Sequence, residues 1–148
     1  MYKHILIATD GSELAQKAVA HGLALAKSVG AEVSFLTATP MWSAMEMTEH
    51  AGHGEPHPIE KYETKSAKWA NKILVACREQ ADKAGVKCKT IHVNDTDPDR
   101  AIVDRAKTSG CDLIVMASHG RGRIGRLLLG SIALKVLTYT PISVQIVR

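Results

Sequence analysis

The stretch from residue 112 to residue 132 constrains this chain more than any other. An unbroken apolar run at residues 113–117 stops at Ser118 and gives way to a loop of glycines and arginines. A short apolar run is typical of a buried parallel strand, although periodicity alone leaves a buried helix open. Glycines let a backbone approach a ligand, and the amides at a helix start attract anions. With the added positive charge of Arg121, Arg123 and Arg126, the stretch predicts a phosphate-binding turn.

Two better-known phosphate motifs nearly fit this stretch and fail. Gly120, Gly122 and Gly125 match the dinucleotide-binding pattern. The 23 residues after Gly125 contain no acid, however, and they are too few for a second βαβ half. The P-loop fails because Arg126 and Leu127 stand where Lys and Ser or Thr are needed. On spacing alone, a mobile glycine-rich surface loop is the alternative.

The same stretch resembles the signature of the universal stress protein (UspA-like) family, in its nucleotide-binding branch. That signature is a glycine, two residues, a glycine, nine residues, and then glycine with serine or threonine. Gly120 is the second glycine, Arg121–Leu129 are the nine residues, and Gly130-Ser131 close the signature. Ala117 takes the place of the first glycine, where its methyl group would crowd a ligand.

The two ends of the chain carry the same resemblance. Residues 5–12 (ILIATDGS) and residues 141–147 (PISVQIV) are similar to the family's first and last strands. The similarity covers the chain apart from about residues 40 to 58. One universal stress protein domain over residues 1–148 is therefore expected.

Composition places the chain among soluble globular proteins. Its 148 residues suit one domain, and 45% of them are hydrophobic and 23% charged. The chain lacks an apolar run of about 18 residues and a signal-peptide pattern, which predicts a cytoplasmic protein without membrane contact. Residues 113–148 carry a net charge of +5, and the rest of the chain −1. This local excess of positive charge favours a small anionic ligand. Nucleic acid is disfavoured because only 4% of the residues are aromatic and no long basic face is apparent.

The three cysteines match no disulfide or metal spacing. Cys77, Cys88 and Cys111 are odd in number, and each falls within a predicted apolar pattern. Buried structural thiols are therefore expected.

Apolar periodicity and capping residues divide the chain into alternating strands and helices. Strands are expected at residues 3–9, 32–39, 86–93 (with Val86, Cys88, Thr90 and His92 on one face) and 113–117, and after Pro141. Four helices are expected. The first runs from Ser12 or Asp10 as N-cap to Gly30, and the second covers residues 59–84. The third runs from Asp97 as N-cap to Gly110, and the fourth covers residues 131–139. This order predicts an α/β fold, a single-domain Rossmann-like open sandwich with a five-stranded parallel sheet and helices on both faces.

Asp10 lies at the carboxyl end of the first predicted strand, where open parallel sheets bind ligands. The first and fourth strands would flank the crevice where the winding reverses, which brings Asp10 next to Gly120. A helix N-cap role alone also accounts for Asp10.

Residues 40–58 break the periodicity and contain Gly52, Gly54, Pro56 and Pro58, which predicts an irregular loop. The loop concentrates histidines beside glutamates, and both are transition-metal ligands. A labile zinc or nickel site is one hypothesis, and a solvated loop is the other; the candidate ligands are His50, His53 and His57.

The resemblance implies a stress-response regulatory or sensor protein that binds ATP or another adenine nucleotide, with or without Mg²⁺. It places the adenine or ribose beside Ala8, Thr9, Asp10, Ala38, Met116 and Ala117. It places the phosphates beside Gly120, Gly130, Ser131 and Ile132, with charge screened by His119, Arg121 and Arg123.

Two other functions stay open at this point. Slow ATP hydrolysis or phosphotransfer would use Asp10 to hold Mg²⁺, but no clear base accompanies it, so binding is favoured over catalysis. A dimeric interaction module that has lost its ligand is supported by Ala117 alone. A homodimer is expected through the last strand, whose Ile142, Val144 and Ile146 point to one side of a sheet edge.

Overall fold

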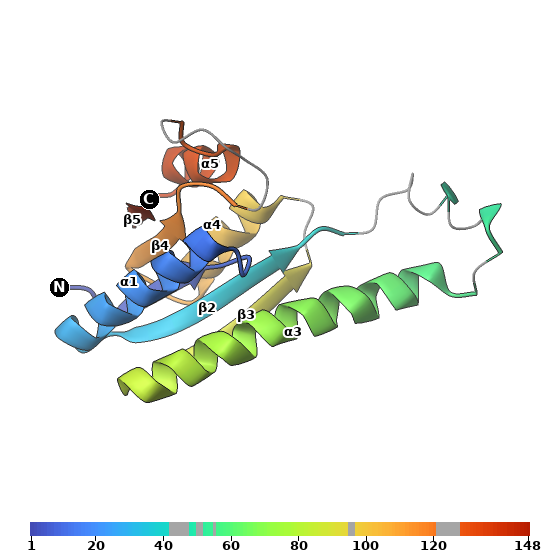
Figure 1. The fold of residues 1–148 in the computed structure, drawn as a ribbon. Helices are drawn as coiled ribbons and strands as arrows, with labels where there is room; N and C mark the ends of the chain where they lie inside the picture. The colour runs from blue at the N-terminus through green and yellow to red at the C-terminus, as the bar shows by residue number, and fades with distance from the viewer. Residues whose placement is uncertain (42–47, 50–51, 55, 95–96, 121–127) are drawn as a thin grey trace.

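The computed structural model describes residues 1–41, 48–49, 52–54, 56–94, 97–120 and 128–148. Strands and helices alternate along the chain (Figure 1). They are β1 (His4–Ala8), α1 (Glu13–Val29), β2 (Glu32–Thr39), α3 (Pro58–Ala84), β3 (Cys88–Asn94), α4 (Pro98–Thr108), β4 (Leu113–Ala117), α5 (Ser131–Tyr139) and β5 (Ser143–Val147). None of the helices in this part of the chain has the length and apolar character that crossing a membrane requires.

The five strands form one parallel sheet in the order β3-β2-β1-β4-β5. The predicted fold class is therefore confirmed. In register, Ile7 of β1 lies between Phe35 of β2 and Val115 of β4. The chain moves outward from β1 through β2 to β3 and then returns to the other side of β1 for β4. The winding thus reverses between β1 and β4, as expected.

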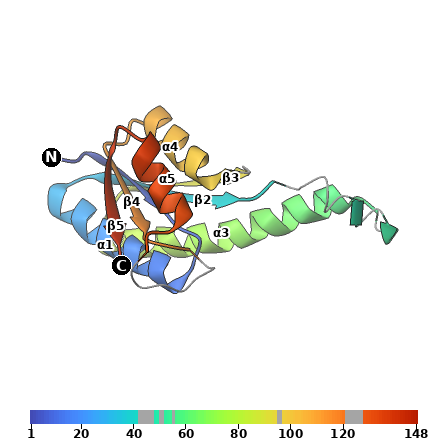
Figure 2. The same ribbon diagram turned by 90° about the horizontal axis from the view of Figure 1, so that it is seen from above.

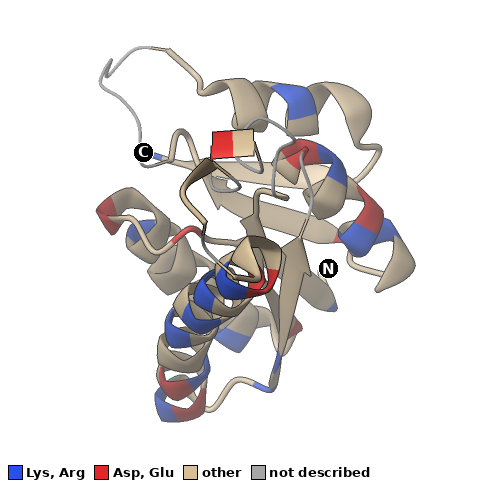
Figure 3. Ribbon diagram, turned by 90° about the vertical axis from the view of Figure 1, so that its right-hand side faces the viewer, with Lys and Arg blue, Asp and Glu red and all other residues tan. Residues whose placement is uncertain are grey.

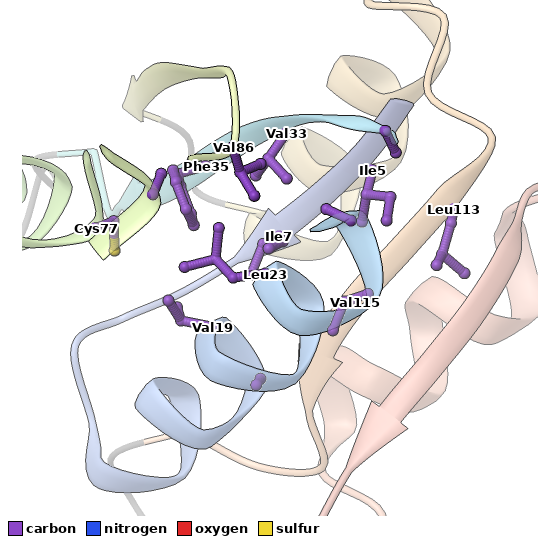
Figure 4. Packing of buried hydrophobic residues seen from close by; sticks show 14 of the residues in the cluster. Ile5, Ile7, Val19, Leu23, Val33, Phe35, Cys77, Val86, Leu113 and Val115 are labelled. Carbon is purple, nitrogen blue, oxygen red and sulfur yellow. The ribbon is translucent and has the colours of Figure 1, made fainter. Parts of the chain in front are cut away.

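Alternating side chains of the central strands build two separate cores. Ile5 and Ile7 face α1 and α3 in a cluster that includes Phe35 and Val115 (Figure 4). Leu6 and its neighbours on the other face pack against α4 and α5. Figure 2 shows the resulting three layers, with the sheet between the two pairs of helices. Both faces of β1 and β4 are buried, which explains why their sequences are continuous apolar runs.

The start of α1 is fixed by two short hydrogen bonds. The Ser12 hydroxyl oxygen accepts from Ala15 N–H (3.2 Å), and Asp10 Oδ1 accepts from Ser12 N–H (3.0 Å). Ser12 is therefore the N-cap, and Asp10 holds the turn that precedes it. Further along α1, a Cβ on Gly22 would lie 2.4 Å from Ile7 Cδ1. A glycine at this position lets the helix lie close to β1.

Two details of the sequence prediction were wrong, and a third was confirmed in its position only. Strand β3 begins at Cys88 rather than at residue 86, because Val86 N–H donates to Ala81 O (2.9 Å) and closes the end of α3. Asp97 is the N-cap of α4, as predicted, although its side chain makes no capping hydrogen bond. Cys77 and Cys111 are buried as expected, whereas Cys88 is only half-buried on the edge strand β3.

Helix α3 extends well past the sheet. Its 27 residues make a rod of about 40 Å, longer than the strands it covers. The buried residues all lie in its second part: Ala70, Leu74, Cys77 and Ala81. The first three turns project beyond the sheet as an arm (Figures 1 and 2).

Candidate functional site

A cavity of about 530 Å³ opens at the carboxyl ends of the central strands, beside the start of α5. Residues from the ends of β1, β2 and β4 meet there with the residues that lead into α5. The cavity brings together most of the sequence-predicted site residues: Ala8, Thr9, Asp10, Ala38, Met116, Ala117, His119, Gly120, Gly130, Ser131 and Ile132. The predicted Arg121 and Arg123 lie outside the described residues.

The sequence interpretation missed an apolar wall of the same cavity. This wall is made by Ala15, Leu36, Pro98, Ile102, Leu128, Leu129 and Ala133. One signal was available: helices that follow parallel strands begin at the sheet edge that binds ligands, and Ala15 and Pro98 are first-turn residues. The rest depend on how α4 and α5 pack, which local patterns do not report. An apolar wall with a few polar groups at one end is the usual composition of a small-molecule pocket.

Asp10 and Gly120 meet across the switch point. A Cβ on Gly120 would lie 2.7 Å from Asp10 Oδ2, so the carboxylate occupies the space that any larger residue would need. The other carboxylate oxygen, Oδ1, accepts from Ser12 N–H. The expected proximity of Asp10 and the Gly120 loop is therefore present.

Thr9 is held rigidly between its neighbours. Its N–H donates to Leu36 O (2.9 Å), and its carbonyl oxygen accepts from the Thr37 hydroxyl (3.0 Å). The Thr9 hydroxyl oxygen in turn accepts from Gly11 N–H (3.2 Å). The backbone leading to Asp10 is thus fixed before any ligand is present.

Gly130 is the N-cap of α5, as predicted, but its amide has a different partner from the one expected. Its N–H donates to Ser118 O (2.7 Å), so it is not directed at a phosphate. A Cβ on Gly130 would lie 2.8 Å from the same oxygen. The glycine is therefore required by the Ser118 backbone, and this contact ties the end of β4 to the start of α5.

The next three amides are the anion-facing group of this helix start. The first intrahelical bond of α5 runs from Leu134 N–H to Gly130 O (2.9 Å). The amides of Ser131, Ile132 and Ala133 therefore have no acceptor within the helix, and all three residues line the cavity. Such amides, with the positive end of the helix dipole, attract anions.

Ala117 leaves the cavity open. Its side chain belongs to the buried cluster on the α1 side of the sheet, together with Leu113 and Val115. The residue is 9% exposed and still forms part of the cavity lining. Ala117 therefore belongs both to the core on the α1 side and to the lining of the cavity.

The histidine loop is described only in part. His50 lies outside the described residues, and His53 and His57 are exposed. His57 Nδ1 lies 3.9 Å from Glu60 Oε2. Among the residues that the structure describes, no three His, Cys, Asp or Glu side chains are grouped as a metal site would need. The three-histidine metal site stays a prediction.

An open parallel sheet with a crevice where its winding reverses defines the class of doubly wound α/β ligand-binding domains. Comparison with known proteins narrows this class. The model of the universal stress protein family matches residues 1–148, and the chain belongs to that family.

Relatives and solved structures agree with this assignment. The universal stress protein YxiE of Bacillus subtilis is 31% identical, with all of both chains covered. The universal stress protein MJ0531 of Methanocaldococcus jannaschii is 29% identical over the whole chain and 83% of its own length.

Among solved structures, the hypothetical protein MJ0577 is 28% identical, with a TM-score of 0.82 over 99% of this chain and 96% of that one. A universal stress protein in complex with cAMP is 25% identical, with a TM-score of 0.73 over 99% and 97% of the two chains. A universal stress protein from Archaeoglobus fulgidus in complex with dAMP, 17% identical with a TM-score of 0.64, shares the fold.

Proposed function

We propose that this protein binds an adenine nucleotide, ATP in the first place, at the crevice between β1 and β4 and acts as a regulatory protein of the stress response. The observation that carries the proposal is the cavity itself. It joins an apolar wall, suited to a flat ring, to amides at the start of α5 that have no acceptor within that helix and are suited to phosphate. The complex of a related universal stress protein with cAMP supports the same ligand class.

In this proposal the adenine lies against the apolar wall near Ala38 and Met116. The ribose lies beside Thr9 and Asp10, whose backbone and carboxylate are already fixed by hydrogen bonds. The phosphates meet the amides of Ser131, Ile132 and Ala133, together with the Ser131 hydroxyl. Gly120 gives the backbone its close approach to Asp10, and Gly130 positions the start of α5.

The direct test is calorimetric titration of the purified protein with ATP, AMP and cyclic AMP, each with and without Mg²⁺. We expect binding of at least one of them below 1 mM. Mass spectrometry of small molecules released by denaturation identifies a ligand that co-purifies. A folded protein that binds none of the three at millimolar concentration would support the ligand-free interaction module and exclude the nucleotide proposal.

Binding without turnover is the favoured activity. Among the described residues that line the cavity, Asp10 is the single carboxylate, and it already accepts from Ser12 N–H. Phosphoryl transfer needs a positioned nucleophile as well as charge stabilisation and a metal. Multiple-turnover phosphate release from ATP tests the enzymatic alternative, and sustained release that is lost in Asp10→Asn would establish it.

We also propose a homodimer formed through β5. This strand is an edge of the sheet, and no other strand of the described residues pairs with its outer N–H and C=O groups. Val144 and Ile146 of this strand, with Ile142 just before it, pack against the α4 and α5 side of the core and are half-buried. An antiparallel pairing of two β5 edges about a twofold axis closes the assembly. A sedimentation mass of one 16.0 kDa chain at micromolar concentration would contradict this proposal.

A further inference from the structure

Helix α3 carries a straight line of lysines on the side that faces away from the sheet. Lys61, Lys65, Lys68 and Lys72 are all exposed. At about 100° per residue they fall within roughly 60° of the helix circumference and span about 16.5 Å along the axis. The buried residues of α3, centred on Ala70 and Leu74, occupy the opposite side. Figure 3 shows the basic bands recurring along one side of this helix.

The charge of this lysine face is not neutralised within the protein. None of the four lysines forms an ion pair with an acidic side chain of the described residues. On the arm, Glu60 lies about 110° from the centre of the stripe, and Glu63 about 170°, on the same side of α3 as the buried residues. A surface hollow of about 540 Å³ is lined by three of these lysines, Lys61, Lys65 and Lys68, and by one carboxylate, Glu60. The net potential over this face is therefore positive.

The composition of the face selects among anionic partners. A protein partner is disfavoured, because lysine is depleted from protein interfaces. A lipid surface is disfavoured, because stable membrane attachment needs an inserted apolar group besides charge, and the stripe contains none. Single-stranded nucleic acid is disfavoured, because no aromatic side chain stands in the stripe to stack on bases. Lysine is a compact point charge and lacks the forked geometry with which arginine recognises base edges. The face is therefore suited to phosphates rather than to bases.

We propose that the lysine face of α3 binds the phosphate backbone of a nucleic-acid duplex without sequence preference. A duplex carries one charge per about 1.7 Å of its axis, so a 16.5 Å stripe spans more phosphates than it has lysines. Each lysine can therefore take its own phosphate. Three of the four lysines, Lys61, Lys65 and Lys68, lie on the arm that projects beyond the sheet. The sequence interpretation disfavoured nucleic acid on scarce aromatic residues and no apparent basic face, because it did not project these four lysines onto the helix that it predicted over residues 59–84.

Counterion release gives the proposal a quantitative signature. Four phosphate contacts predict that log K falls with log salt concentration at a slope of about −3.6, since each contact contributes about −0.9. Between 50 and 200 mM salt the affinity should then fall about 150-fold. Replacing two of the four lysines should reduce the slope to about −1.8.

The experiment is fluorescence anisotropy of a labelled 30-base-pair duplex of mixed sequence, titrated with the full chain at salt concentrations from 25 to 200 mM. The test variant replaces all four lysines of the stripe by glutamine. The matched control replaces four exposed lysines outside α3, Lys3, Lys17, Lys27 and Lys107, by glutamine. Both variants lose the same net charge, and circular dichroism establishes that both are folded.

We expect the wild type and the control variant to bind with the same steep salt slope, and the stripe variant to lose binding. Equal loss in both variants would show that net charge alone attracts the duplex, and would overturn the assignment to α3. Duplex binding that survives in the stripe variant would also overturn it. A parallel experiment with anionic and zwitterionic vesicles tests the lipid alternative. If the protein attaches to anionic vesicles and does not bind the duplex, a lipid surface replaces nucleic acid as the partner.

Discussion

The Asp10 carboxylate stands in the place where a side chain on Gly120 would begin. Oδ2 would lie 2.7 Å from a Cβ at position 120, while Oδ1 is held by Ser12 N–H at 3.0 Å. The end of β1 and the loop after β4 are thus fitted to each other across the switch point. Neither residue can change size without disturbing the other.

The first prediction follows from this contact. Gly120→Ala should lower the free energy of unfolding by about 1 kcal/mol, because the added methyl displaces a carboxylate that is held by a hydrogen bond. In an Asp10→Ala background the same substitution should cost less than about 0.5 kcal/mol, because the obstacle has gone. Urea denaturation of the four proteins measures this double-mutant cycle. An additive cycle would show that the two residues are not in contact.

Gly130 gives a prediction that does not involve ligand. Gly130→Ala should lower the free energy of unfolding by about 2–3 kcal/mol without nucleotide, because the new Cβ meets backbone atoms, which cannot rotate away. Gly52→Ala is the control, since a Cβ there has no neighbour within 4 Å. It should change stability by less than about 0.5 kcal/mol. If Gly130→Ala is as stable as the control, the tie between Ser118 and α5 does not contribute to folding.

His92 predicts a pH dependence of stability. Its Nε2 is bonded to the Thr39 hydroxyl (2.7 Å), and burial lowers the pKa of the imidazole below its ordinary value. The unfolded chain therefore takes up the proton first as pH falls below about 6.5, and the stability due to His92 is lost between that pH and the lower folded pKa. Below the folded pKa the loss levels off.

Denaturation midpoints of the wild type and His92→Gln, measured from pH 5 to pH 7.5, test this pH dependence. The difference in unfolding free energy between the two proteins should shrink as the pH falls. A difference that stays constant across this range would exclude His92 as the source.

The cysteines should react in a set order. Burial raises the pKa of both Cys77 and Cys111 to about 11, so almost no thiolate forms near neutral pH. Cys88 has a raised pKa as well but is half-buried on an edge strand. We therefore expect iodoacetamide at pH 8 to modify Cys88 first, and the other two only when urea unfolds the protein. Peptide mass spectrometry identifies the modified residues, and early labelling of Cys77 would contradict the packing of α3.

The sequence allowed the fold to be predicted because its local signals agree with one another. The apolar runs of β1 and β4 are long enough only for strands, and Gly30 and Gly85 end the helices with φ of 70° and 72°. The alternation of strands and helices then leaves few parallel arrangements. The adjacency of Asp10 and Gly120 follows from that topology alone.

Other features depend on contacts between distant residues and could not be predicted. The partner of the Gly130 amide is Ser118 O, and no pattern near either residue indicates this bond. The start of β3 was misplaced because Val86 is apolar both as a strand residue and as the residue that closes α3. The apolar wall of the cavity likewise comes from the packing of α4 and α5 on the sheet.

The uneven anchoring of α3 has a consequence for its local stability. One continuous helix is fastened to the sheet by Ala70, Leu74, Cys77 and Ala81, while none of the residues before Ala70 is buried. Backbone hydrogen bonds in the second part can open only when the core opens, whereas those in the first turns can open alone. The two ends of the same helix therefore exchange their amide protons with water at different rates. The arm can unfold and refold locally while the rest of the domain stays folded.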